Sequence, residues 1–365
     1  MRVLHVIARM NVGGTATYLA NLISGLENAG VTDLLAMGHV PSGEAEDAVV
    51  SELPIKRVSH LSREISLSED RLALSELDQI IEEFKPDLIH SHTFKAGLLV
   101  RMRTRSVPIV HSFHGHHLYD PEFGFIKRNV LNLIERRLAK KSDEIITIGS
   151  KVCDELLEVG IGKREQYTSI APGIKPLLAR DRAGVRSRLR IGLDETVVMW
   201  LGRFTQVKRP DLVVELAKEF PGATFVMAGG GELLDGLRAK AGKNLRFVGF
   251  EDKNDMWSIA DIGLCTSDSE GMPLSLIEAQ LAGVAVVSTD VGSVSEIVED
   301  GKTGYLASRG LQSLVSALKP LVESADLRKT MGSAAKQRAT ELFSADVMVQ
   351  AHLRLYRRLL DKVSR

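Results

Sequence analysis

The sequence predicts an α/β protein made of two doubly wound domains, each a parallel sheet covered by helices on both faces. Short apolar runs, many of them β-branched, recur along the chain, and most are apolar throughout, as strands buried on both faces should be. Helix-like segments separate many of these runs. The chain has 365 residues, more than the roughly 250–300 at which a single core stops growing.

The first block of alternating elements runs from Met1 to about Gly173. Its expected strands are 3–8, 33–38, 87–93, 108–114, 144–150 and 168–172, and its clearest helices are 16–30 and 72–84. Strands and helices that alternate in this way form parallel sheets.

The second block begins at VVMWLG. Its expected strands are 197–202, 224–230, 245–250, 262–267, 284–290 and 304–308, with helices at 209–220 and 273–283. Residues 175–195 are basic and poor in strand patterns, so we expect a linker that contains one helix.

We therefore expect an N-terminal domain over residues 1–175 and a C-terminal domain over 176–345. The last segment, about 346–365, has apolar residues at helical spacing and is expected to pack back on the N-terminal domain. Open α/β sheets bind ligands outside the carboxyl ends of their strands. We expect the two domains to face each other across a cleft, each offering one wall of a site.

Composition narrows the class of protein. The 44% hydrophobic and 26% charged residues are typical of a soluble globular protein, and 47 basic against 47 acidic side chains argue against a nucleic-acid partner. Cys153 and Cys265 form no CxxC pair and are expected to be free thiols in a reducing compartment. No stretch approaches the ~18 apolar residues that span a bilayer, and the apolar run at the N-terminus is too short for a signal peptide. We expect a cytoplasmic protein.

Adjacent glycines follow the first strand, in NVGGTATYL. Gly13 and Gly14 leave the backbone bare just before a helix whose N–H groups could meet a phosphate. The pattern is not GxGxxG, so it is no dinucleotide fingerprint. A plain strand-to-helix turn fits equally well, and both interpretations stay open.

Two cations follow the strand 197–202, in LGRFTQVKRP. Arg203 comes directly after the strand, and Lys208 precedes a helix that Pro210 is expected to open. A guanidinium and an ammonium at the mouth of a parallel sheet can clamp a diphosphate. The alternative is a pair of solvated surface charges, and the strand-end position favours the clamp.

Two further strands of the second block end in candidate ligand contacts. Gly229 and the two glycines after it, in MAGGGELL, permit close approach of a ligand. In VGFEDK, backbone groups near Phe250 could meet the edge of a base.

Two carboxylates bracket the turn in SEGMPLSLIE. Glu270 should point toward the site from the loop after strand 262–267, and Glu278 lies about one turn into the following helix. A carboxylate buried among apolar neighbours needs partners, and sugar or ribose hydroxyls would supply them.

Together, GGT, GRF-xx-VKR and E-GMPLSLI-E resemble the family 4 glycosyltransferases of the GT-B fold, which depend on nucleotide sugars. PDLIHSHT, SFHG, SDEIITIGS, APGI and TGYLA are similar to lesser signatures of that family, so the resemblance covers nearly the whole chain. It implies two Rossmann-like domains, an N-terminal one for the acceptor and a C-terminal one for the donor, and transfer with retention of anomeric configuration.

The resemblance also implies roles for particular residues. Arg203 and Lys208 would neutralise the donor diphosphate, Glu278 would bind the ribose, and Glu270 would hold hydroxyls of the transferred sugar. His114, in SFHG, would approach the sugar near its reacting carbon. Backbone N–H groups would line the phosphates and sugar; they belong to Gly14, Gly271, Met272 and Leu274. The leaving phosphate, in that scheme, accepts the proton of the acceptor.

A metal site is the alternative use of six crowded histidines: His90, His92, His111, His114, His116 and His117. Their spacing matches no zinc pattern, and the chain has no DxD; residues 268–270 are only a DxE. A clamp made of Arg203 and Lys208 makes a divalent ion unnecessary. We expect no metal and no cofactor, the nucleotide sugar being a substrate.

Residues 95–141 hold ten basic side chains against three acidic ones, with Tyr119, Phe123 and Phe125 among them. This segment could dock on an anionic membrane near a lipid-linked acceptor. A solvated helix face explains the charges equally well.

We therefore interpret the chain as a retaining glycosyltransferase that moves a sugar from a nucleoside-diphosphate sugar, most simply a UDP-sugar, to a cell-envelope or surface-polysaccharide precursor. Its acceptor would be a glycan or a lipid-linked molecule, and it would act in the cytoplasm, at the inner face of the membrane if it docks there. The rivals are a nucleotide-sugar epimerase or hydrolase of the same fold, and a non-catalytic nucleotide-sugar binding protein.

Overall fold

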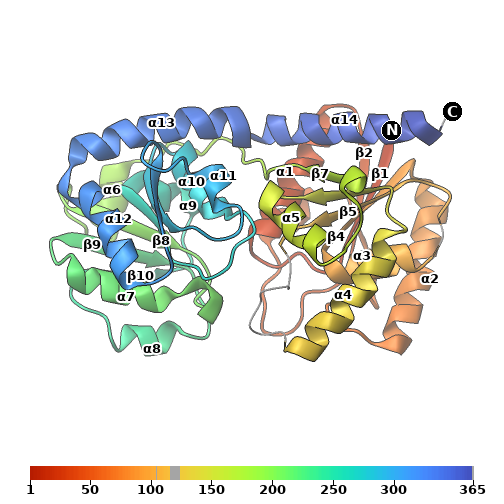
Figure 1. The fold of residues 1–365 in the computed structure, drawn as a ribbon, viewed down its shortest axis with the longest axis horizontal. Coiled ribbons are helices and arrows are strands. Elements are labelled where there is room, and N and C mark those ends of the chain that lie inside the picture. The colour runs from red at the N-terminus through yellow and green to blue at the C-terminus, as the bar shows by residue number, and fades with distance from the viewer. Residues whose placement is uncertain (104, 116–123, 364–365) are drawn as a thin grey trace. The chain divides into compact units, whose positions relative to one another are not determined.

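The computed structural model of the protein describes residues 1–103, 105–115 and 124–363 (Figure 1). The chain divides into two compact units. Unit 1 comprises Met1–Lys175 and Ala345–Arg365, and unit 2 comprises Pro176–Ser344. Each unit is built on a parallel sheet, so the predicted class of two doubly wound α/β domains is confirmed. The cleft expected between them stays a prediction.

The sheet of unit 1 has, in the described residues, seven parallel strands in the order β3-β2-β1-β4-β5-β6-β7. All residues of β4, β5 and β6 are buried, as in a parallel sheet covered on both faces, and these strands bury polar side chains as well as apolar ones. The strands are β1 (Arg2–Ile7), β2 (Thr32–Met37), β3 (Ile55–Arg57), β4 (Leu88–His92), β5 (Ile109–Phe113), β6 (Glu144–Thr147) and β7 (Tyr167–Ser169).

Helices cover both faces of this sheet. Side chains of a strand alternate between the two faces, so one strand contributes residues to both cores. Val3 and Ile7 of β1 pack in one core with α1 (Gly14–Asn28) and α14 (Ala345–Val363). Leu4 and Val6 pack in a second core with α2 (Leu67–Phe84) and α3 (Thr93–Met102). The other helices of the unit are η1 (Ala48–Glu52), α4 (Phe125–Ala139), α5 (Ser150–Glu158) and η2 (Arg164–Gln166).

The last helix, α14, belongs to unit 1 although it follows unit 2 in the sequence (Figure 1). Two polar contacts tie it to α1 and to β4: the Tyr18 hydroxyl of α1 lies 3.0 Å from Nε2 of His352, and the Tyr356 hydroxyl lies 2.6 Å from Nδ1 of His90 on β4. Gly25 of α1 permits close packing, because a Cβ there would lie 2.3 Å from Cγ2 of Val349.

Unit 2 has, in the described residues, a six-stranded parallel sheet in the order β10-β9-β8-β11-β12-β13. Its strands are β8 (Thr196–Leu201), β9 (Ala223–Ala228), β10 (Leu245–Gly249), β11 (Ile262–Cys265), β12 (Ala285–Thr289) and β13 (Gly304–Ala307). Its helices are α6 (Arg182–Arg188), η3 (Gln206–Lys208), α7 (Pro210–Glu219), α8 (Leu234–Arg238), α9 (Lys253–Ile259), α10 (Leu274–Leu281), α11 (Val294–Ile297), α12 (Leu311–Glu323) and α13 (Ala325–Phe343). The expected linker helix is α6, whose buried Arg186 donates to Asp261 at 2.8 Å and so fastens the linker to this unit.

Candidate active site

The strand order of unit 2 changes direction between β8 and β11, which are neighbours in the sheet. The chain leaves β8 toward β9 on one side and leaves β11 toward β12 on the other. Open α/β sheets bind ligands at such switch points, outside the carboxyl ends of the strands. Arg203 and Lys208 follow β8, and Glu270 follows β11, so three of the predicted site residues meet here.

Thr266 holds the two loops of this switch point together. Its hydroxyl donates to the backbone carbonyl of Lys208 at 2.9 Å, and it accepts the indole N–H of Trp200 at 3.1 Å. Two residues after Thr266, the backbone N–H of Asp268 donates to the carbonyl of Val207 at 2.8 Å. These contacts fix the loop that carries Lys208 relative to the loop that carries Glu270.

Lys208 and Glu270 form an ion pair, with 2.5 Å between Nζ and Oε1. The Ser267 hydroxyl donates to the same oxygen at 2.6 Å. Burial lowers the pKa of Lys208, but the Glu270 carboxylate more than offsets it, so the net pKa is raised above its usual value. Lys208 thus carries its positive charge at neutral pH.

Arg203 lies close enough for its charge to act on Lys208. The Arg203 side chain is exposed, and its positive charge opposes the raised pKa of Lys208, as a like charge must. Two cations near each other, one of them paired with an acid, form a site with an excess of positive charge that favours an anionic ligand.

Glu278 is buried on α10 and already has partners. Nζ of Lys253 lies 2.7 Å from its Oε1, and the indole N–H of Trp257 lies 3.3 Å from its Oε2. Both partners come from α9. Sequence reasoning missed Lys253, because a single lysine after a strand gives no signal that distinguishes it from a solvated charge.

The turn before α10 is supported from beneath by the loop after β12. A Cβ at Gly292 would lie 1.7 Å from the carbonyl oxygen of Glu270, so only glycine fits there. The N–H of Ser293 donates to the carbonyl of Gly271 at 2.8 Å. In the described residues, α10 begins at Leu274 without a side-chain cap and without an acid in its first turn. Because no side chain caps this end in the described residues, the N-terminus of α10 can face an anion.

Gly229 and Phe250 lie at the same edge of the sheet. Gly229 has φ 125°, and a Cβ there would lie 2.1 Å from the carbonyl oxygen of Gly202, so the loops after β8 and β9 touch. The Phe250 ring lies over Gly230 and is 76% exposed. An aromatic ring left this exposed beside a bare backbone can stack on a planar ligand group.

In unit 1 the switch point falls between β1 and β4. Gly14 opens α1 there, and α1 likewise has neither a side-chain cap nor an acid in its first turn. His114 follows β5 and is half-buried, with the Tyr18 ring edge-on at 4.6 Å between ring centroids. These two predicted residues belong to unit 1, while the other predicted site residues belong to unit 2.

The histidines of unit 1 form a buried polar cluster rather than an exposed one. Burial lowers the pKa of His90, His92 and His111 well below the usual value, and neighbouring charges lower it further. Burial also lowers the pKa of His114 to about 3 and that of His352 to about 4. His116 and His117 lie outside the described residues.

One group in the described residues has ligand atoms close enough to hold a metal ion: His5, His90 and His92, with one nitrogen of each within 4.8 Å of the others. Each of their six ring nitrogens already has a hydrogen-bond partner within the protein. The absence of a metal stays a prediction.

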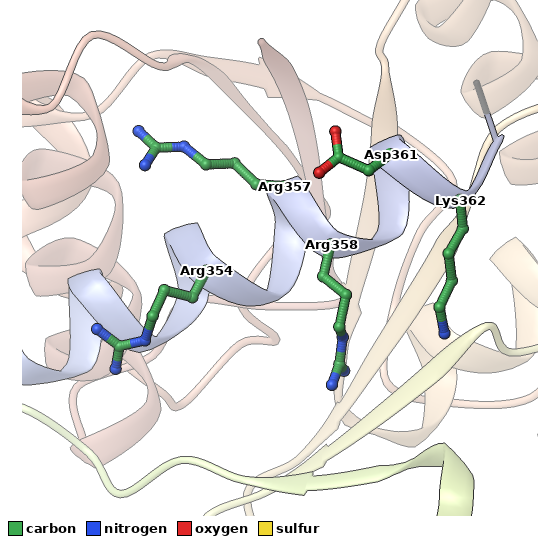
Figure 2. Close-up of a pocket in the computed structure, with 5 residues that line it drawn as sticks. All are labelled: Arg354, Arg357, Arg358, Asp361 and Lys362. Atoms are coloured by element: carbon green, nitrogen blue, oxygen red, sulfur yellow. The ribbon is translucent and has the colours of Figure 1, made fainter. Parts of the chain in front are cut away.

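A basic pocket lies on α14, where none of the predicted site residues lies (Figure 2). Arg358 and Lys362 point the same way in this view, and Arg358 pairs with Glu144 at 2.8 Å. The pocket is lined by Arg354, Arg357, Arg358, Asp361 and Lys362.

The basic segment 95–141 is less of a surface than the sequence suggested. Lys95 is buried beside Asp70, and Arg101 is buried and pairs with Glu135 at 3.0 Å. Both were counted as surface charges because their acidic partners are 25 and 34 residues away in the sequence. Arg103 and Arg105, in turn, both pair with Asp78. The remaining charges gather on α4 and just after it. Tyr119 and Phe123 lie outside the described residues, as does the side chain of Phe125.

Two parallel-sheet Rossmann-like domains with a cationic ligand site at a switch point define the class of protein: a glycosyltransferase of the GT-B fold. Comparison with known proteins supports this class. Residues 12–176 match the family model "Glycosyltransferase Family 4", and residues 181–338 match "Glycosyl transferases group 1". The chain belongs to the family 4 glycosyltransferases and is a transferase enzyme.

Curated relatives carry glycosyltransferase names. The glycogen synthase of Mycobacterium tuberculosis (strain CDC 1551 / Oshkosh) is 25% identical over 388 residues, covering 94% of this chain and 91% of that protein. The D-inositol 3-phosphate glycosyltransferase of Nocardia farcinica is 29% identical over 283 residues, covering 67% of this chain and 61% of that protein.

Solved structures share the fold. Anabaena HepE in complex with UDP and glucose has a TM-score of 0.85 at 19% identity, covering 98% of this chain and 100% of that one. The sucrose-phosphate synthase of Thermosynechococcus elongatus has a TM-score of 0.87 at 19% identity, covering 99% of this chain and 100% of that one.

We expect unit 1, but not unit 2, to lose stability as the pH falls below about 6.5. A histidine whose folded pKa is lowered takes up a proton on unfolding, so its contribution to stability is complete above the unfolded pKa and is lost as the pH falls toward the folded one. Each such histidine lowers the free energy of unfolding of unit 1 by up to about 1.4 kcal/mol for every pH unit in that window. Five act together: His90, His92, His111, His114 and His352.

The chain contains its own control. All ten histidines lie in the sequence of unit 1, and both tryptophans, Trp200 and Trp257, lie in unit 2. Tryptophan fluorescence therefore reports the unfolding of unit 2, and far-UV circular dichroism reports both units. Between about pH 7 and pH 5 the dichroism should develop an earlier thermal transition while the fluorescence midpoint stays in place. A fluorescence midpoint that fell in step would contradict the assignment.

Proposed function

We propose that the protein is a retaining glycosyltransferase that moves a sugar from a nucleoside-diphosphate sugar to a cell-envelope or surface-polysaccharide acceptor. The donor is a UDP-sugar and the acceptor a glycan or a lipid-linked molecule. The observation that carries the proposal is the ion pair of Lys208 and Glu270 at the switch point of unit 2, with the Arg203 charge beside it.

This ion pair suits a ligand that carries both negative charge and hydroxyl groups. A donor diphosphate takes Lys208 and Arg203 as its cations, and a sugar hydroxyl then donates to Glu270 in place of Lys208. The N-terminus of α10 adds backbone N–H groups to the phosphates. No charge is left without a partner in either state.

Glu278 and Phe250 suit the nucleoside part. Glu278 accepts the ribose hydroxyls from the buried position that Lys253 and Trp257 give it. Phe250 and the backbone beside it flank the base. The similarity to Anabaena HepE, whose crystal structures hold UDP with glucose or UDP-glucose, supports uracil as the base.

The transfer step needs no protein base. The acceptor hydroxyl attacks the anomeric carbon from the face that the diphosphate leaves, its proton passes to the leaving phosphate, and the configuration is retained. Arg203 and Lys208 stabilise the negative charge that grows on the leaving group. His114 of unit 1 contacts the transferred sugar, and the N–H of Gly14, also of unit 1, is among those that line the phosphates and sugar.

Turnover of the donor distinguishes the proposed transferase from two rival functions. An epimerase or hydrolase of the same fold consumes a UDP-sugar without an acceptor, and a binding protein consumes none. Release of UDP measured with and without candidate acceptors separates the three: release that depends on an acceptor supports transfer, and acceptor-independent release or no release overturns it.

We expect Lys208→Ala and Arg203→Ala to lower kcat by about 10²–10³ each and to weaken donor binding much less. Preorganised charges of this kind act mainly on the charge that develops in the transition state. Glu278→Ala removes a ribose contact remote from that charge, so it should mainly raise the donor Kd. Steady-state kcat and donor Kd by calorimetry for the three variants measure the difference.

Lys218→Ala provides the matched control for removing a lysine charge. Lys218 pairs with Glu215 on the surface of α7, so both constants should stay within about twofold of those of the unaltered protein. Near-normal turnover of Lys208→Ala would show that Lys208 does not hold the leaving group.

We propose that transfer is independent of metal, because Arg203 and Lys208 occupy the place that a divalent ion takes in other diphosphate sites. Transfer rates should therefore change less than about twofold in excess EDTA. A complete loss of rate that Mg²⁺ or Mn²⁺ restores would contradict this, and it would direct attention to His5, His90 and His92.

We also propose that α4 docks on anionic membrane at the inner face of the cell membrane, in the cytoplasm. No helix in the described part of the chain is long and apolar enough to cross a membrane. Three apolar side chains on one stripe of α4 are nevertheless exposed: Ile126 at 79%, Val130 at 51% and Leu133 at 47%. Arg137 and Lys140 lie near its end. An apolar stripe beside basic residues suits the surface of an anionic bilayer.

We expect the protein to bind vesicles of phosphatidylglycerol mixed with phosphatidylcholine, and to bind more weakly as salt rises. Joint Ile126→Ser and Val130→Ser substitutions, or joint Arg137→Glu and Lys140→Glu substitutions, should abolish co-sedimentation and leave the donor Kd unchanged. Leu193→Ser, at a 67% exposed leucine of unit 2, is the control and should bind normally. Equal binding to pure phosphatidylcholine would count against the proposal.

A further inference from the structure

Four buried or half-buried side chains of unit 1 form one continuous row of hydrogen bonds, here named the Asp–His row: Asp33, His5, His92 and His114. Oδ1 of Asp33 lies 2.9 Å from Nε2 of His5, and Nδ1 of His5 lies 3.2 Å from Nε2 of His92. Nδ1 of His92 lies 3.1 Å from Nε2 of His114. The row starts on β2, crosses β1 and β4, and ends just after β5, at the carboxyl edge of the sheet.

A row of neutral imidazoles has a direction, because each ring carries one N–H and one lone pair. The Asp33 carboxylate can only accept, so Nε2 of His5 donates to it, and in a neutral His5 ring Nδ1 then accepts. Nε2 of His92 then donates to His5, and Nδ1 of His92 accepts from Nε2 of His114. The proton of His114 is thereby assigned to Nε2, and its Nδ1 keeps the lone pair.

The surroundings keep the row separate from the rest of the histidine cluster. Both nitrogens of His90 are taken, by the hydroxyls of Tyr356 and Ser112 at 2.6 Å each. Nδ1 of His352 lies 2.8 Å from the carbonyl of Met348, which fixes that ring as the acceptor for Tyr18. Burial lowers the pKa of His92 and of His114, so both rings of the row's outer half are neutral at pH 7.

We propose that Asp33 sets, through His5 and His92, the tautomer of His114, so that Nδ1 of His114 accepts a hydrogen bond from a hydroxyl of the transferred sugar. Asp33, His5 and His92 are positioning residues, since they act through His114. The sugar-facing part of the inference rests on the proposed function, whereas the tautomer itself does not.

The polarity of this nitrogen decides which sugars fit. A lone pair at Nδ1 accepts from a hydroxyl, and a sugar without a hydroxyl at that position leaves the hydrogen bond unmade. With the row reversed, His114 would present an N–H instead and would select for an acceptor atom on the sugar. Asp33 is buried on β2 and acts on His114 only through His5 and His92, so in the proposal the polarity is determined by a group other than the one that faces the sugar.

The test begins with the unaltered protein labelled with ¹⁵N in its histidines. The ¹⁵N shifts of a ring distinguish a nitrogen that bears a proton from one with a lone pair, and comparison with His114→Gln assigns the signals. We expect His114 to carry its proton on Nε2 at pH 7. A proton on Nδ1 of His114 would overturn the proposal, as would a stoichiometric metal ion in the purified protein. Neither measurement requires a substitution in the Asp–His row.

Asp33→Asn then tests the cause. The amide can donate as well as accept, so the row loses its direction, and the His114 signals should show both tautomers or the reversed one. Where a sugar donor is turned over, kcat should fall roughly tenfold, about the value of one hydrogen bond, at an unchanged donor Kd.

Ser91→Ala is the matched control. Ser91 is buried on β4 next to His92 and bonds Nδ1 of His111 at 3.0 Å, outside the row. It should lower the melting temperature as Asp33→Asn does but keep the His114 tautomer and kcat. If Asp33→Asn matches Ser91→Ala in both readouts, Asp33 has only a structural role. Full activity of His114→Ala would instead refute the contact of His114 with the sugar and leave the tautomer result standing.

Discussion

A charge that is removed from water needs a partner, and this constraint organises both units. Lys208 and Glu270 satisfy it in unit 2 by pairing with each other across the switch point. The backbone on either side is held by Thr266 and by the contact of Gly292 with Glu270. The ion pair is therefore a fixed feature of the loops, and a ligand that enters must replace the pairing it disrupts.

Unit 1 meets the same constraint with buried ion pairs, such as that of Arg101 and Glu135, and in its histidine cluster with neutral groups. Its buried histidines each find a hydrogen-bond partner, and burial keeps them uncharged by lowering their pKa. A cluster of cationic imidazoles at this depth would be far more costly than a network of donors and acceptors. The consequence is that the histidine cluster of unit 1 is held by directed hydrogen bonds, while the switch point of unit 2 is held by charge.

The sequence predicted the sheets well, because strands buried on both faces leave continuous apolar runs that no other element of their length produces. Arg203, Lys208 and Glu270 could also be predicted, since each lies in the loop that follows such a run. Contacts between side chains from distant segments of the chain could not be predicted. Lys95 and Arg101 were counted as surface charges, and Lys253 was missed. His5 and Asp33 gave no signal, because a spacing of 28 residues does not indicate that two side chains meet on neighbouring strands.

The exchange of partners at Glu270 explains how one site could combine affinity with selectivity in the proposed function. Removing one member of a buried ion pair costs about 3–5 kcal/mol, so a diphosphate that took Lys208 and left Glu270 unpaired would bind poorly. A sugar hydroxyl that reaches Glu270 removes this cost. The same carboxylate then discriminates strongly against a sugar that lacks the hydroxyl, since sites built to bond a hydroxyl reject analogues without it by a factor on the order of 10⁴. Nucleotide alone carries the charge without the hydroxyl, so in the proposed function only the complete donor would satisfy both Lys208 and Glu270.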